Sequence, residues 1–69
     1  MNELERKACG EKLRELRGDM SQTEVAYKIG VSQNAISSYE TGARVPRDDV
    51  KKRLCALYGK SVSEIFFGG

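Results

Sequence analysis

Four short, uncharged hydrogen-bonding side chains stand close together near the middle of the chain, namely Gln33, Asn34, Ser37 and Ser38. At helical spacing they share one face of a helix over residues 33–41. Amides and hydroxyls of this size pair with base edges in the major groove of DNA. The alternative is a solvated surface face, but such a face usually carries Lys and Glu, which are better helix formers. Base contact, with Gln33 and Asn34 nearest the bases because they open the helix, and a solvated surface face are thus the two interpretations of these residues.

A second helix, over residues 22–29, must hold this polar face outward. Ser21 and Glu24 form a capping box at its start, Gly30 supplies the left-handed residue at its end, and Ser32 caps the polar helix. The apolar residues spaced to pack one helix across the other are Val25, Ile29, Val31, Ile36 and Tyr39. Two short helices joined by so tight a turn are typical of DNA-reading motifs.

Three further helices are predicted around this pair. Residues 3–17 and 48–58 have amphipathic spacing, and Ser61 with Glu64 repeats the capping box before a short final helix. No segment predicts a strand. The sequence therefore predicts an all-α fold and a single domain over residues 1–69.

These elements resemble the lambda-repressor and Cro type of helix-turn-helix, also called the xenobiotic-response-element family. The stretches that follow its pattern, in order and at nearly its spacing, are residues 14–17, 20–26, 36–42 and 58–66, with Pro46 between the last two. The link from Arg17 to Met20 is shorter than usual, and Asp48 and Lys51 are polar where many members are aliphatic. The resemblance implies a compact five-helix bundle with the helix-turn-helix at its second and third helices.

The resemblance also implies a function, and it favours base contact by the four polar side chains. It indicates a sequence-specific regulator of transcription that binds double-stranded DNA, more often as a repressor, and acts as a homodimer on a palindromic operator with residues 33–41 in the major groove. It further implies that Gln22 touches the DNA backbone and that Arg17 and Glu40 form a partly buried ion pair. The alternatives are a plain helix-starting amide and two independent surface charges. A protein-interaction module, such as an antitoxin that sequesters a partner protein, is the second functional hypothesis.

Positive charge is concentrated in one segment. The formal net charge is only +2, but residues 42–60 contain six basic and two acidic residues. Arg44 and Arg47 lie in the loop after the polar helix, where a DNA backbone would pass, so we expect them to contact phosphates or the minor-groove edge. A solvated surface charge is an equal alternative for each arginine. The basic run at 51–53 is expected to act through long-range attraction and solubility, with direct contacts to DNA as the alternative.

The core of so short a chain is small, since a domain of this size buries only about 60% of the surface its unfolded chain exposes. The residues predicted to form it are Cys9, Leu13, Leu16, Val25, Ile29, Val31, Ile36, Tyr39, Leu54 and Leu57. Ile65, Phe66 and Phe67 exceed what such a core should absorb. We therefore expect these three residues to form the dimer contact, together with the face of the fourth helix.

Other functional classes find little support. Cys9 and Cys55 are far apart in sequence and no histidine accompanies them, so we expect two buried thiols rather than a metal site, with a disulfide as the alternative. No nucleophile, base or carboxylate pair suggests catalysis, a cofactor or a small-molecule ligand. No run of about 20 apolar residues and no signal peptide are present, which predicts a cytoplasmic protein without a membrane partner.

Overall fold

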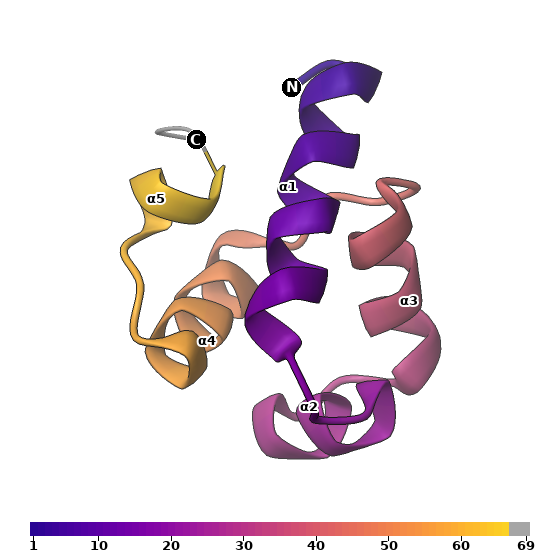
Figure 1. Ribbon diagram of the computed structural model, residues 1–69, viewed down its shortest axis with the longest axis vertical. Helices are drawn as coiled ribbons and strands as arrows, with labels where there is room; N and C mark the ends of the chain where they lie inside the picture. Colours follow the sequence, from indigo (N-terminus) through magenta and orange to yellow (C-terminus); the bar gives the residue numbers. More distant parts are fainter. Residues whose placement is uncertain (67–69) are drawn as a thin grey trace.

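The computed structural model describes residues 1–66, which form five α-helices and no strand (Figure 1). The helices are α1 (Glu3–Arg17), α2 (Gln22–Ile29), α3 (Gln33–Thr41), α4 (Asp48–Tyr58) and α5 (Val62–Phe66). The all-α fold is confirmed.

Helices α2 and α3 begin where side chains satisfy their free backbone amides. Ser21 Oγ accepts from Glu24 N at 3.0 Å, and Glu24 Oε1 accepts from Ser21 N at 3.3 Å. Ser32 Oγ caps α3 through Ala35 N at 3.1 Å. Side-chain caps of this kind fix the starts of α2 and α3, which is why these boundaries were predictable, whereas α4 begins after Arg47 with no side-chain cap.

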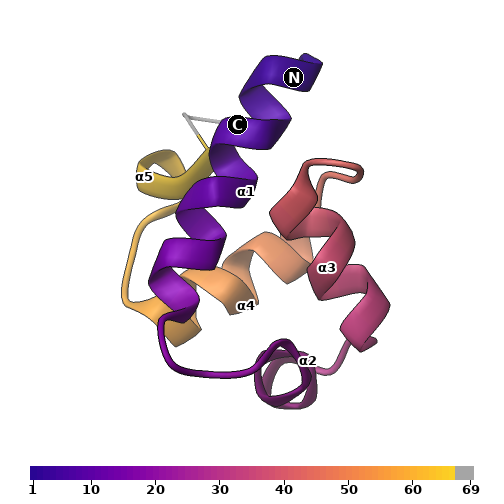
Figure 2. The same cartoon turned by 45° about the vertical axis from the view of Figure 1, so that its right-hand side comes forward.

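Helix α1 runs through the middle of the molecule and contacts α3 on one side and α5 on the other (Figure 1). Helix α2 crosses below the end of α1 and packs against α3 and α4 (Figures 1 and 2). Gly30 ends α2 at φ 75°, in the left-handed region, so the chain can turn directly into α3. This tight turn fixes the direction of α3 relative to α2.

The core is larger than predicted. Its buried apolar residues are Cys9, Leu13, Val25, Ala26, Ile29, Ala35, Ile36, Tyr39, Val50, Leu54, Cys55, Ile65 and Phe66. Leu16, Val31 and Leu57 were predicted as core but are only partly buried at its edge. Cys9 and Cys55 are buried free thiols, as predicted, and burial raises the pKa of both.

Helices α1 and α3 approach so closely that Gly10 has no room for a side chain. A Cβ atom on Gly10 would lie 2.3 Å from the carbonyl oxygen of Glu40 and 2.7 Å from that of Tyr39. Both obstacles are backbone, which cannot move aside as a flexible side chain would. The glycine that weakens α1 locally is therefore required where the two helices meet.

We expect Gly10→Ala to destabilise the domain. Helix propensity alone predicts a gain of about 1 kcal/mol, whereas overpacking costs about 1–3 kcal/mol, and the clash with α3 backbone decides the sign. Denaturant unfolding of the variant measures the change in the free energy of unfolding. Glu11→Ala, at an exposed position on α1, is the control and should change stability by no more than about 0.5 kcal/mol. An unfolding free energy equal to or above wild type would show that α1 and α3 can separate at little cost.

Candidate nucleic-acid interface

The outer face of α3 carries the four polar residues identified in the sequence. Gln33 and Asn34 are exposed in the first turn, and Ser37 and Ser38 are half-buried in the next. The opposite face is buried in the core through Ala35, Ile36, Tyr39 and Glu40. Core packing therefore fixes the rotation of α3 about its axis and leaves these four side chains accessible together.

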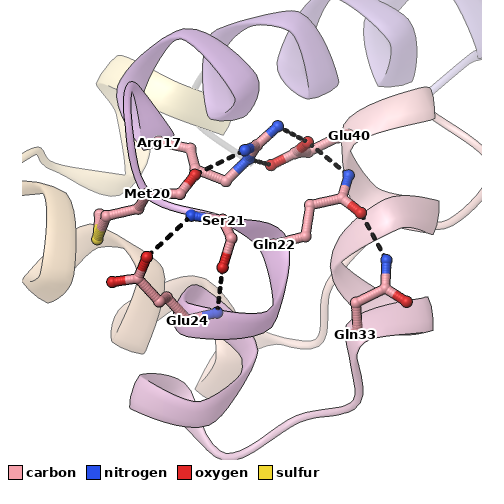
Figure 3. A network of polar contacts seen from close by, with 7 residues as sticks. All are labelled: Arg17, Met20, Ser21, Gln22, Glu24, Gln33 and Glu40. Atoms are coloured by element: carbon pink, nitrogen blue, oxygen red, sulfur yellow. Dashed lines mark hydrogen bonds and ion pairs between the residues drawn. The ribbon is translucent and has the colours of Figure 1, made fainter.

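A partly buried ion pair joins α1 to α3, as predicted. Arg17 Nε donates to Glu40 Oε2 at 2.7 Å, and Arg17 Nη2 donates to Glu40 Oε1 at 3.1 Å (Figure 3). Arg17 Nη1 also donates to the carbonyl of Met20 at 2.7 Å. The hydrogen bond to Glu40 raises the pKa of Arg17. This two-point contact holds the short link into α2 against the end of α3.

The ion pair extends into a chain of amides that reaches the outer face. Gln22 Nε2 donates to Glu40 Oε1 at 3.0 Å, and Gln33 Nε2 donates to Gln22 Oε1 at 2.6 Å (Figure 3). A carboxylate only accepts, so Glu40 dictates which end of the Gln22 amide faces it. Gln22 must then present its oxygen to Gln33.

The chain of contacts also fixes the hydrogen-bonding capacity of Gln33. One Nε2 hydrogen is taken by Gln22, which leaves the other hydrogen and Oε1 for an outside partner. The sequence identified Gln22 and Gln33 separately but missed this pairing, because their positions in two different helices say nothing of side-chain reach.

Tyr58 lies beside the same charges. Burial raises its pKa to about 12, and the negative charge of Glu40 adds to this, while Arg17 opposes it. The phenol is therefore neutral at physiological pH and contributes no charge to the interface.

The two loop arginines lie on the other flank of α3. The Arg44 guanidinium is 6.0 Å from the centroid of the Tyr39 ring, and the Arg44 backbone amide donates to Ser38 O at 3.2 Å. Arg44 and Arg47 are both exposed. The loop thus begins anchored to α3 and holds positive charge beside it.

The basic run in α4 does not behave as one solvated group. Lys51 is only 8% exposed, with Nζ 5.2 Å from the Phe66 ring centroid and 3.9 Å from Asp48 Oδ1. Arg53 Nη1 donates to the carbonyl of Ile29 at 3.1 Å. Lys52 is exposed. The prediction of long-range attraction for all three residues was therefore too simple, because Lys51 and Arg53 also take part in packing.

Comparison of the sequence with known proteins identifies the family of this chain. Residues 8–65 match the family described as "Helix-turn-helix domain". The chain belongs to this helix-turn-helix family. A stretch of 56 residues is 38% identical to the "Cryptic phage CTXphi transcriptional repressor RstR" of Vibrio cholerae, covering 78% of this chain and 50% of that protein. Another of 51 residues is 45% identical to an "Uncharacterized HTH-type transcriptional regulator" of Archaeoglobus fulgidus, covering 70% of this chain and 22% of that protein. The chain thus spans half or less of these relatives.

The expected dimer contact of this helix-turn-helix chain needs correction. Ile65 and Phe66 are each 1% exposed within a single protomer, packed in the core with Leu54 and Val25. Helix α5 folds back against α1 and α4, so the core absorbs both side chains and leaves them no surface for a second protomer. Phe67 lies outside the described residues.

Two further features of the described residues bear on function. Within residues 1–66, no three His, Cys, Asp or Glu side chains gather as a metal site requires. Each helix in this part of the chain is too short or too polar to cross a membrane.

Proposed function

We propose that this chain is the DNA-binding domain of a transcriptional regulator of the lambda-repressor and Cro type, and that α3 enters the major groove. The observation that carries the proposal is the outer face of α3, where the exposed Gln33 amide is held by the chain of contacts from Arg17 through Glu40 and Gln22. A side chain held in place before binding loses less conformational entropy on contact. The named functions of both relatives support the same role.

The hydrogen-bonding capacity left to Gln33 suits an adenine. Its Oε1 accepts from the adenine N6 amino group while its remaining Nε2 hydrogen donates to N7. Gln22 would meanwhile keep its position at the start of α2, where free backbone amides face the phosphate backbone. Asn34, Ser37 and Ser38 complete the contact along the groove.

A homodimer on a palindromic operator is the form of binding that we propose. A two-fold dimer presents two α3 helices about 34 Å apart, so the half-sites should be inverted repeats with centres about 10 base pairs apart, or a multiple of that spacing. Repression is the expected outcome, because a protein bound at such a site can block polymerase by occupancy.

Selection of bound duplexes from a random pool tests this proposal. The expected product is an inverted repeat whose half-sites contain an adenine at the position nearest Gln33. Enrichment of a single, asymmetric half-site would contradict the dimer. Recovery of no sequence above background would contradict base reading by α3.

We expect Arg44→Ala and Arg47→Ala to weaken binding to the selected duplex and to a scrambled duplex equally, because phosphate contacts carry no sequence information. Removing one phosphate contact should also flatten the slope of log affinity against log salt by about 1. Binding titrations at several salt concentrations give both quantities. Slopes equal to wild type in both variants would assign these arginines to the solvated surface.

A further inference from the structure

An open groove of about 350 Å³ lies beside α3, between the turn that precedes it, the loop that follows it and α4. Its lining includes Arg44, Arg47, Arg53, Ser32 and Asp49. Among the described residues of this lining, three guanidinium groups face one carboxylate. The groove therefore has a net positive charge and suits an anion.

Arg53 is held in the groove by contacts on two sides. Its Nη1 donates to the carbonyl of Ile29, at the end of α2, at 3.1 Å, and its Nη2 lies 3.8 Å from Asp49 Oδ2. The side chain is nevertheless 53% exposed. A guanidinium carries five N–H donors, so these contacts leave donors for a ligand while fixing the position of the group.

The groove and the amide chain flank α3 on opposite sides. Ala35 and Tyr39 line the groove, whereas Gln33 and Glu40 bond to Gln22 on the other flank. The two sugar-phosphate strands likewise flank a helix that lies in the major groove. The arginine groove is thus placed to meet the strand that Gln22 does not.

We propose that this groove binds a backbone phosphate of the duplex and that Arg53, from α4, is a contact residue for it alongside the loop arginines. The inference rests on the proposed function, and it adds a third arginine, from outside the helix-turn-helix and its loop. Arginine suits this role because its planar fork can donate two hydrogen bonds to one phosphate.

The test removes one phosphate charge at a time. Single methylphosphonate substitutions along the selected duplex neutralise individual phosphates, and each is titrated with wild type, Arg53→Gln and Lys52→Gln. At one position per half-site, neutralising the phosphate should reduce the affinity of wild type and of Lys52→Gln roughly tenfold more than that of Arg53→Gln, which has already lost one charge-assisted contact and keeps only those of the loop arginines. The Arg53 side chain is 53% exposed, so the substitution should leave the fold intact.

Two results would overturn the inference. One is that Arg53→Gln stays as sensitive as wild type at every phosphate. The other is that Lys52→Gln loses as much affinity as Arg53→Gln and shows the same reduced sensitivity at the same phosphate, since the effect would then come from general positive charge and not from a contact by Arg53. If wild type binds no duplex at all, the proposed function fails as well, and that outcome is distinct from both.

Between about 50 and about 200 mM salt, Arg53→Gln should also lose about threefold less affinity than wild type.

Discussion

Replacing Phe66 by alanine is expected to unfold most of the protein at room temperature. The ring is 1% exposed and packs in the core, under the Lys51 ammonium. Truncating a buried phenylalanine costs about 3–5 kcal/mol. A domain below about 70–80 residues rarely has more than about 3–5 kcal/mol to lose. Thermal and denaturant unfolding followed by circular dichroism measures the loss.

Leu4→Ala is the matched control for Phe66→Ala. Leu4 is 78% exposed, so its truncation should change stability by no more than about 0.5 kcal/mol. If Phe66→Ala instead keeps its unfolding midpoint and only lowers the mass of the particle in solution, Phe66 belongs to a contact between protomers and its burial in the core is wrong.

Removing Glu40 is expected to be about as damaging. Glu40→Ala leaves the Arg17 guanidinium without its carboxylate in a site where the two side chains are 17% and 5% exposed. Removing one partner of a buried ion pair costs about 3–5 kcal/mol, because the remaining charge stays poorly solvated. The variant also frees Gln22, and with it Gln33. Unfolding titrations measure the loss of stability.

Two further variants separate charge burial from positioning. Glu3→Ala breaks the exposed pair with Lys7 on the same helix α1 and should cost less than about 1 kcal/mol. The double variant Arg17→Met with Glu40→Leu should recover most of the stability, since an apolar pair of similar size can replace a buried ion pair. Its preference for the selected duplex over a scrambled one should stay lowered, because Gln22 no longer bonds to a carboxylate at position 40. A double variant with wild-type preference would show that the amide chain does not position Gln33.

The helices were predictable because their ends are set by local chemistry. Ser21 with Glu24, Ser32 and Ser61 with Glu64 satisfy amides a few residues away, and glycines follow the ends of the helices. The face of α3 that points outward was predictable for a related reason. The apolar residues of α3 form a single stripe along the helix, so only that side can face the core.

The remaining features depend on contacts between distant segments. Phe66 looked surplus because its burial requires α5 to fold back on α1 and α4. A glycine within a helix lowers its stability by propensity alone, and only the distance from Gly10 to the α3 backbone shows why it is required. The bond from Gln33 to Gln22 and that from Arg53 to Ile29 join side chains whose reach the sequence does not specify.

Base reading by α3 is the central claim, and one comparison tests it directly. Wild type, Gln33→Ala, Asn34→Ala and the double variant are titrated against the selected duplex and a scrambled duplex at one salt concentration. Each substitution should cost about 1–3 kcal/mol on the selected duplex if the residue makes a two-bond contact with a base. It should cost little on scrambled DNA, where backbone charge supplies the affinity. The ratio of specific to non-specific affinity should therefore fall in each single variant and furthest in the double variant. An unchanged ratio in all three variants would contradict the claim that α3 reads the operator.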